Sequence, residues 1–391
     1  MHYMKSAILN IQSTSPPTTL HVRMYSRVPL LICRYGKHLS QEQVAELVAP
    51  HPDTLALVNS WLHHNSVPPS SVSMIDGGSW LTLTGVPMTR ANELLGASYE
   101  LYRHTKTNET IIRTVGYALP WVLHAHVKTV APTTFFASTQ TLQMTPRSHP
   151  VRAAATEVKA ASGKLAKVPS SREEVPEKNF VTPDYLRWLY GTFAYRPVSM
   201  HSNGLGIAGF NKLYPSDKDL TKFMSELRTD ATDANFTVVK VNGGDYEPSH
   251  PSVEPNMNIQ YASALTYPTP TTYYSIGGQY AINDTTGTPA PGDIYLEWYN
   301  YLIAQPTIPQ TISVSYGSEE RGLPPEYAEA ICELFAKLGA RGVSILFASG
   351  DDGTGPSNCT DGGGEVRFIP NFPASCTYDV FLSLQHMRKY K

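Results

Sequence analysis

The stretch Pro325-Glu-Tyr-Ala-Glu-Ala-Ile-Cys-Glu-Leu-Phe-Ala-Lys-Leu-Gly-Ala-Arg-Gly-Val-Ser-Ile-Leu-Phe-Ala-Ser-Gly-Asp351 decides the fold class of this chain. Residues 325–338 carry apolar side chains at helical spacing, and residues 343–348 form a nearly continuous apolar run. A helix followed closely by an apolar strand is typical of a parallel sheet that is covered on both faces. Functional sites of such sheets lie at the carboxyl ends of the strands. We therefore expect Asp351, directly after the strand, to lie at a site.

The same alternation of helices and strands extends upstream from that stretch. The patterns predict strands at 205–210, 236–241 and 311–316, and helices at 181–190, 217–227 and 255–265. Together they predict an α/β domain over residues 179–380, with a parallel sheet and helices on both of its faces. Short helices and alternating strands between 34 and 137 predict a separate small α+β domain. Its first helix begins with a capping box formed by Ser40 and Gln43.

Three further segments flank or join these two domains. Residues 1–33 show no sustained periodicity, and we expect an atypical N-terminus there. Residues 138–178 are largely polar and rich in Ala, Lys and Ser, which is typical of an exposed linker or processing region. A frayed surface helix is the alternative for that segment. Residues 381–391 form a divergent tail that ends basic.

Composition excludes several classes of partner. The 391 residues carry a formal net charge of -2, which gives no electrostatic reason to expect a nucleic acid. The apolar runs are too short to span a membrane, and no recognisable signal peptide opens the chain. Glycosylation sequons occur at four asparagines and matter only in a secreted chain, with chance as the alternative reading. These asparagines are Asn108, Asn235, Asn283 and Asn358.

The four cysteines of the chain could be free thiols, a disulfide or metal ligands. Cys359 and Cys376 flank a glycine-rich loop and are a candidate disulfide pair. Cys332 lies on the apolar pattern of a helix, and we expect it to be a buried thiol. No C-x-x-C or H-x-x-x-H pattern accompanies them, so no zinc site is predicted. His124 and His126 alternate as on a strand, but without a third ligand nearby we expect them to face solvent.

Two polar residues share one face of a predicted helix. In Val253-Glu-Pro-Asn-Met-Asn258, Glu254 and Asn258 are four residues apart, just over one helical turn. With Ser349-Gly350-Asp351, this pattern resembles the serine-carboxyl peptidases, or sedolisins, in which a helix carries Glu-x-x-x-Asp and a later Ser-Gly-Asp supplies the oxyanion-hole aspartate. Without the resemblance, the pair would read as an ordinary surface pair and Asp351 as a turn aspartate.

The small domain resembles the activation pro-domain of the same family. The matching stretches are Arg34-Tyr-Gly-Lys-His-Leu-Ser40, Trp80-Leu-Thr-Leu-Thr-Gly85 and Ala97-Ser-Tyr-Glu-Leu-Tyr-Arg-His104. The resemblance implies a subtilisin-like fold and a secreted zymogen, similar to fungal tripeptidyl-peptidases, that hydrolyses peptides and proteins at acidic pH. It also implies that the pro-domain acts as an intramolecular inhibitor of the peptidase domain.

The resemblance assigns roles to particular residues. Glu254 takes the position of the general base and Asp351 that of the oxyanion donor. Asn258 stands where the family has its second carboxylate, and an amide cannot hold or pass a proton. Ser315, Tyr316 and Gly317 resemble the strand that lines the substrate cleft.

The family's nucleophile motif, Gly-Thr-Ser, does not occur in these residues. The family's calcium site would also lie beyond residue 391, so we predict no nucleophile, metal or cofactor in this chain. We expect a C-terminally truncated and inactive peptidase, produced by a premature stop, a retained intron or a gene-model error. The alternative is a non-catalytic protein that binds or inhibits an intact relative. Motifs of subtilisins, zinc peptidases and α/β-hydrolases are absent.

Overall fold

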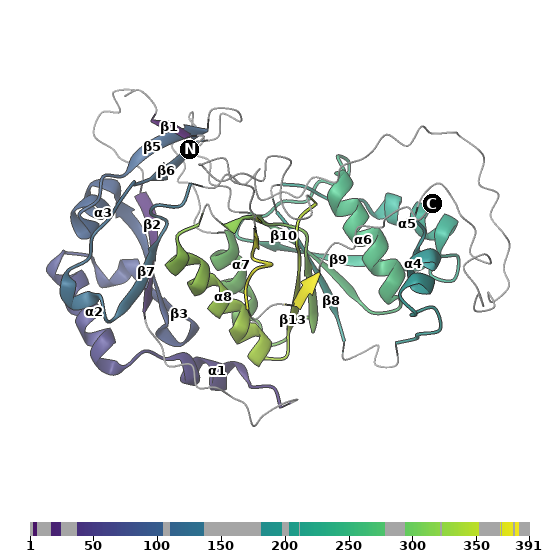
Figure 1. Ribbon diagram of the computed structural model, residues 1–391, viewed down its shortest axis with the longest axis horizontal. Coiled ribbons are helices and arrows are strands. Elements are labelled where there is room, and N and C mark those ends of the chain that lie inside the picture. The colour runs from purple at the N-terminus through teal and green to yellow at the C-terminus, as the bar shows by residue number, and fades with distance from the viewer. Residues whose placement is uncertain are drawn as a thin grey trace. The chain divides into compact units, whose positions relative to one another are not determined.

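The computed structural model describes twelve ranges of the chain, which divide into two compact units. The described residues are 3–5, 17–24, 37–104, 110–136, 181–197, 203–210, 212–277, 294–320, 323–351, 368, 370–377 and 380–382. The first unit comprises 1–144, 277–308 and 316–391, and the second comprises 145–276 and 309–315. Figure 1 labels their helices and strands. No described helix is long and apolar enough to cross a membrane.

The first unit begins with a four-stranded antiparallel sheet in the order β3-β4-β2-β7. Its strands are β2 (Pro17–Met24), β3 (Val72–Ile75), β4 (Trp80–Pro87) and β7 (Val127–Ala131). Helices α2 (Pro52–His64) and α3 (Met88–Leu95) contribute Val58, Leu62 and Leu94 to one apolar core with the sheet. The result is the small α+β sandwich that the sequence predicts.

Strand β2 lies inside this sheet, between β4 and β7, so Pro17–Met24 forms a regular strand within residues 1–33, where no sustained periodicity predicts one. Leu20, Val22 and Met24 face the core, while His21 and Arg23 alternate with them. Strand β2 was missed in the sequence because basic side chains usually mark exposed positions. Here His21 and Arg23 are buried, at 0% and 1% exposure.

Shorter elements complete this domain. Strands β1 (Tyr3–Lys5), β5 (Glu100–His104) and β6 (Thr110–Arg113) form a three-stranded antiparallel sheet. Helix α1 (Gln41–Val48) has the predicted capping box: Ser40 Oγ accepts from the Gln43 amide at 3.2 Å, and Gln43 Oε1 accepts from the Ser40 amide at 3.0 Å.

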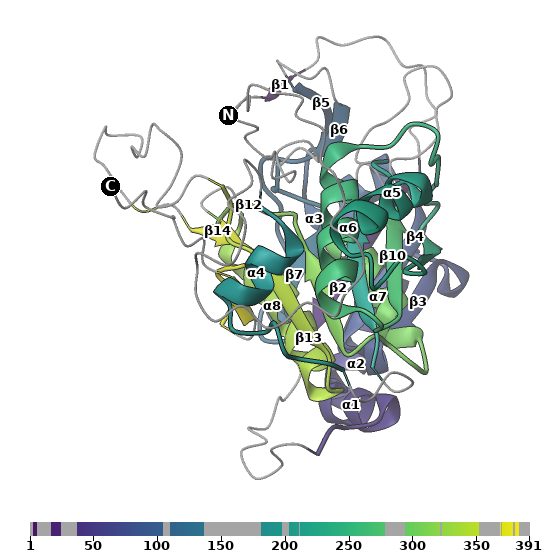
Figure 2. The same ribbon diagram turned by 90° about the vertical axis from the view of Figure 1, so that its right-hand side faces the viewer.

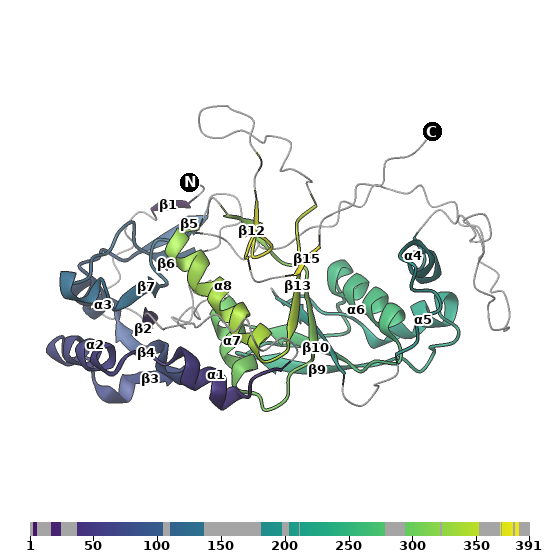
Figure 3. The same cartoon turned by 60° about the horizontal axis from the view of Figure 1, so that its bottom comes forward.

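The remainder of the first unit is built on two apolar helices. They are α7 (Ile294–Ala304) and α8 (Pro325–Ala340), which lie side by side (Figure 3). Helix α8 also packs against β7 and against β13 (Ser344–Ala348), which pairs in parallel with β15 (Val380–Leu382). Two short strands, β12 (Ser318–Glu319) and β14 (Asn371–Phe372), pair antiparallel. The predicted helix–strand unit of residues 325–348 is confirmed.

The second unit holds a parallel sheet in the order β11-β8-β10-β9. Its strands are β8 (Leu205–Gly209), β9 (Phe236–Val241), β10 (Thr271–Ile276) and β11 (Thr311–Val314). Helices α5 (Asp217–Leu227) and α6 (Val253–Thr266) share a core with β8 and β10 through Leu220, Met224 and Ile259. Helix α4 (Pro183–Leu189) packs against α6, as Figure 2 shows. The predicted α/β class, a parallel sheet flanked by helices, is confirmed.

Candidate active site

The first turn of α6 brings three of the predicted site residues together. Glu254 is 4% exposed in this turn, where the partial positive charge of the helix N-terminus favours a carboxylate. Asn258, one turn later, donates through Nδ2 to Glu254 Oε1 at 3.2 Å. Ser315, the residue after β11, donates through Oγ to Asn258 Oδ1 at 3.2 Å. The three side chains form one hydrogen-bonded row at the carboxyl end of a sheet strand.

Asn256 fixes the position of this turn, a role that the sequence reading did not assign. Its Oδ1 accepts from the Ser216 amide at 2.8 Å, and its Nδ2 donates to Asp219 Oδ2 at 2.7 Å. Ser216 is the N-cap of α5, so the starts of α5 and α6 are joined. The signal in the sequence is only that Asn256 lies between Glu254 and Asn258.

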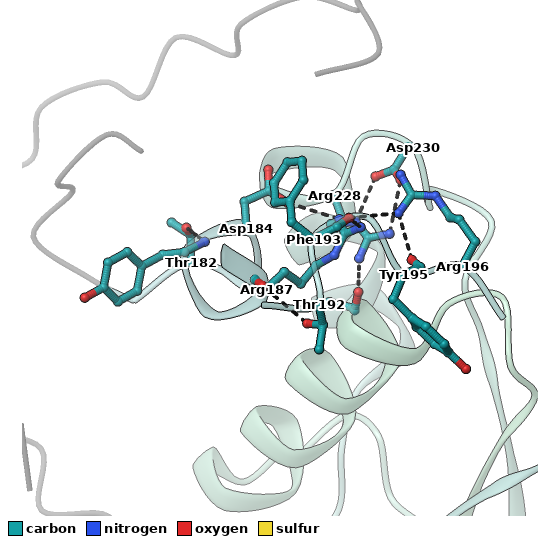
Figure 4. A network of polar contacts seen from close by, with 11 residues as sticks. Thr182, Asp184, Arg187, Thr192, Phe193, Tyr195, Arg196, Arg228 and Asp230 are labelled. Carbon is teal, nitrogen blue, oxygen red and sulfur yellow. Dashed lines mark hydrogen bonds and ion pairs between the residues drawn. The ribbon is translucent and has the colours of Figure 1, made fainter. Parts of the chain in front are cut away.

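The other end of α6 is held by an arginine network (Figure 4). Arg228 binds Asp230 through Nε at 2.8 Å and Nη2 at 3.1 Å, and donates through Nη1 to the carbonyl of Ala264, near the end of α6. Arg187 of α4 donates to the carbonyl of Phe193 at 2.6 Å. Burial, then the nearby Arg228 charge, lowers the pKa of Arg187. Because contacts hold both ends of α6, the positions of Glu254 and Asn258 on this helix are fixed.

Asp351 lies in the first unit, exposed in a bend after β13. Gly350, just before it, has φ +95°, and a Cβ there would meet Asn371 Nδ2 at 2.6 Å. A side chain at position 350 would therefore strain the turn that carries Asp351. The structure describes Asp351 in one unit and the Glu254 row in the other.

The three residues predicted to line the cleft differ in exposure. Ser315 is partly exposed, whereas Gly317 is buried and the Tyr316 side chain is 1% exposed. The Tyr316 carbonyl accepts from the Tyr295 hydroxyl at 3.4 Å. Any contact of Tyr316 with a peptide would therefore involve its backbone, and a substrate-binding role for these residues stays a prediction.

The disulfide joins Cys332 to Cys376, with Cα atoms 5.5 Å apart. The predicted pairing of Cys359 with Cys376 is wrong, and so is the expectation that Cys332 is a thiol. Helix α8 carries Cys332 to the loop that follows β14, a contact between residues 44 positions apart that no local pattern reveals. Among the described residues, no group of three or more His, Cys, Asp and Glu side chains could hold a metal ion.

The predicted glycosylation sites fall in two classes. Asn235 lies exposed just before β9, so its side chain is accessible, and its glycosylation stays a prediction. The other three predicted glycosylation sites lie outside the described residues, as does Cys359. These three sites are Asn108, Asn283 and Asn358.

The expectation that both histidines face solvent is correct for His124, which is exposed. His126 is half-buried, and its ring is hydrogen-bonded to Thr54 Oγ1 at 2.8 Å.

Within the first unit, buried charges join the small domain to α8. Glu333 accepts from Arg23 at 2.9 Å and from Lys128 at 2.7 Å. Lys337 pairs with Asp76 and donates to Ser79 Oγ at 3.0 Å. We call these five charged residues the β2–α8 contact. Their side chains are between 1% and 27% exposed, so the ion pairs are screened only weakly by solvent.

Burial and the nearby Arg23 lower the pKa of Lys337 to about 8, although Asp76 acts in the opposite direction. A neighbouring polar contact joins the small domain to α7. His21 of β2 lies 3.0 Å from Thr82 Oγ1 and 3.4 Å from the carboxylate of Glu297 on α7. The small domain is therefore held against α7 and α8 by specific polar contacts as well as by apolar packing.

The β2–α8 contact should weaken in acid. Burial raises the pKa of Glu333, but Lys128 and Arg23 outweigh it, so the pKa lies below its ordinary value of 4.5. A carboxyl group with a lowered folded-state pKa stabilises the fold above its unfolded pKa and loses that effect as pH falls through the folded value. We expect Glu333→Gln to lower the melting temperature at pH 7 and to differ progressively less from the parent as pH falls below about 4.5.

Thermal melts of both proteins between pH 7 and about pH 3.5 measure this effect. Glu326→Gln, on the exposed face of the same helix, is the matched control and should change little at any pH. A Glu333→Gln deficit that stays constant across the acid range would contradict the prediction.

Comparisons with known proteins found one family model, several curated relatives and solved structures that are similar to parts of this chain. The family model described as "Pro-kumamolisin, activation domain" matches residues 33–136. A solved structure described as Pseudomonas sedolisin (serine-carboxyl proteinase) complexed with two molecules of pseudo-iodotyrostatin is similar over 51% of this chain and 52% of that chain. The TM-score is 0.38 and the sequence identity is 17%.

Fungal relatives match most of the chain. Tripeptidyl-peptidase SED2 of Arthroderma otae is 32% identical over 357 residues, which cover 88% of this chain and 57% of that protein. Probable tripeptidyl-peptidase SED3 of Trichophyton verrucosum is 31% identical over 355 residues, with 88% and 56% covered. The chain thus spans little more than half the length of these relatives. These matches support a sedolisin-family, tripeptidyl-peptidase-like protein with an activation domain at residues 33–136.

Proposed function

We propose that this chain comprises the activation domain and the first part of the peptidase domain of a secreted, tripeptidyl-peptidase-like zymogen that acts on peptides at acidic pH. The observation that carries the proposal is the Glu254–Asn258–Ser315 row at the start of α6. The proposal is supported by the burial of Glu254, to which the resemblance assigns the general-base position, and by the 32% identity of the chain to a tripeptidyl-peptidase.

A carboxylate base suits acidic conditions. Histidine is already protonated there and cannot accept a proton, whereas a carboxylate still can. Glu254 would accept the proton of a serine nucleophile, and Asp351, in its protonated form, would donate to the oxyanion of the tetrahedral intermediate. Asn258 would orient Glu254 through its hydrogen bond but could not relay the proton onward.

The nucleophile is not among these 391 residues, which contain no Gly-Thr-Ser. Without a nucleophile no acyl-enzyme forms, so we propose that these residues alone do not hydrolyse peptides. We also propose that they bind no metal or cofactor. In the zymogen, the activation domain would bind the peptidase domain and inhibit it intramolecularly.

Cleavage of a fluorogenic tripeptide from about pH 3 to about pH 7, which brackets carboxyl pKa values, tests the proposal. Two proteins are compared: the 391-residue chain, and a chimera extended by the part of Arthroderma otae SED2 that lies beyond the matched region. We expect turnover from the chimera and its loss in the Glu254→Gln chimera. Robust turnover by the 391-residue chain that survives Glu254→Gln would overturn the assignment.

A second candidate is a non-catalytic binding protein that inhibits an intact relative. The activation-domain match at residues 33–136 favours it, because such a domain could bind a related peptidase. Adding the 391-residue chain to active SED2 separates the two functions. An inhibitor of this kind would block SED2 stoichiometrically. A domain engaged with its own α7 and α8 would not, because the intramolecular contact competes at high effective concentration.

A further inference from the structure

Ser315 occupies a fixed position relative to α6. It follows β11, whose parallel pairing with β8 aligns Thr311 with Leu205 and Val314 with Ala208. Its hydroxyl reaches the amide of Asn258 from the sheet, on the side of the amide opposite to Glu254. Asn258 is therefore held between a sheet residue and a residue of its own helix.

The donors and acceptors in this row have one consistent order. An amide side chain has an acceptor end and a donor end, and a serine hydroxyl can serve either. With Oδ1 toward Ser315, Asn258 turns Nδ2 toward the Glu254 carboxylate and both contacts are hydrogen bonds. The flipped amide would place its oxygen against a carboxylate oxygen, a contact between two acceptors. The hydroxyl of Ser315 can thus lock the favourable orientation.

We propose that Ser315 is a positioning residue that holds the carbonyl of Asn258 and thereby directs its amide N–H groups to Glu254. This deepens the proposed function, on which it rests for the role of Glu254 as a base. Ser315 is not a substitute nucleophile in this arrangement, because its proton points to an amide oxygen, which is too weak a base to accept it. Its role also differs from that of a residue that simply lines the cleft.

Other charged groups lie around α6 but bind elsewhere on it. Asp219 contacts Asn256, and Arg228 contacts the carbonyl of Ala264 at the far end of the helix. The Tyr261 hydroxyl donates to the carbonyl of Val181 at 2.5 Å. Asn258 contacts both Ser315 and Glu254, so a change at Ser315 is expected to reach Glu254 through Asn258.

The test is the pH dependence of Glu254 modification in the 391-residue chain. A carbodiimide with glycinamide labels carboxyl groups, and mass spectrometry of the Glu254 peptide gives the midpoint for this one residue. Because a hydrogen bond to the ionised form lowers a carboxyl pKa, Asn258→Ala should raise the midpoint by about half a pH unit or more. Ser315→Ala should raise it in the same direction, and Ser315→Thr, which keeps the hydroxyl, should not.

The double variant decides the mechanism. If Ser315 acts through Asn258, Ser315→Ala adds nothing in the Asn258→Ala background. Ser313→Ala, which removes a hydroxyl from β11 itself, is the matched control and should leave the midpoint unchanged. Ser315→Cys, with a weaker donor of similar size, replaces Ser315→Ala if that variant misfolds. An unchanged Glu254 midpoint in the Ser315 variant, or additive shifts in the double variant, overturns the proposal. Because this readout needs no turnover, a failed peptidase assay leaves it intact.

Discussion

Replacing Asp76 by alanine is expected to lower the free energy of unfolding of the first unit by about 3–5 kcal/mol. The side chains of Asp76 and Lys337 are 1% and 4% exposed, so the substitution leaves an ammonium group buried without its carboxylate. Among the described residues, the hydrogen-bond acceptor that remains for Lys337 is the neutral Ser79 Oγ. Urea denaturation followed by circular dichroism and by tryptophan fluorescence, which reports on the buried Trp80 and Trp298, measures the loss.

Two further variants make this test specific. Asp53→Ala removes a carboxylate of the same domain that is 85% exposed, and it should change the stability by less than about 0.5 kcal/mol. Combining Asp76→Ala with Lys337→Met removes both charges, and most of the loss should then be recovered, because no buried charge is left unpaired. Equal stabilities of the Asp76→Ala and Asp53→Ala proteins would contradict a structural role for the pair.

The turn that carries Asp76 explains why this residue can reach α8. Asp76, Gly77 and Gly78 all have positive φ, at 55°, 64° and 84°. A Cβ at Gly77 would stand 2.3 Å from the carbonyl oxygen of Ala45, so only glycine fits there. The Asp-Gly-Gly sequence is thus a turn signal, but its second use, pairing with a lysine 261 positions away, is invisible locally.

The sequence predicts elements wherever apolar periodicity is strong. Helix α8 and strand β13 were located to within two residues because their apolar side chains repeat regularly. Strand β10 was missed because it reads Thr-Thr-Tyr-Tyr-Ser-Ile, in which hydroxyl groups hide a mostly buried strand. Helix α7 was missed because it is apolar nearly all round, with Trp298 and Leu302 fully buried, and so shows no polar face.

Likewise, only part of the candidate site could be predicted from the sequence. Glu254 and Asn258 could be placed together from the sequence because helical geometry alone sets a four-residue spacing. The bond from Ser315 and the anchor at Asn256 depend on how α6 packs against β11 and α5, which no spacing along the chain encodes. The Cys332–Cys376 disulfide was missed for this reason too. Local rules thus find a pair on one helix, and packing adds its partners.

Asn258 should limit the rate of the proposed peptidase. In the chimera with SED2, Asn258→Asp is expected to raise turnover at acidic pH by about 10²–10⁴-fold, the usual effect of a positioned proton-transfer group. Beside Glu254, an aspartate could share a proton with it, whereas the present amide only donates a hydrogen bond. Initial rates on the fluorogenic tripeptide from about pH 3 to about pH 7 measure the gain.

The gain must come from position 258 and not from added negative charge. Asn235→Asp makes the same chemical change at an exposed site of the same unit, and it should leave turnover nearly unchanged. Adding Glu254→Gln to Asn258→Asp should abolish the gain, because the proton then has no acceptor at the start of α6. Ser315 can donate to an aspartate as well as to an amide, so its hydrogen bond is expected to survive the substitution. If the Asn258→Asp chimera is folded but no faster than its parent, the proton does not pass through position 258, and Glu254 would have to act without it.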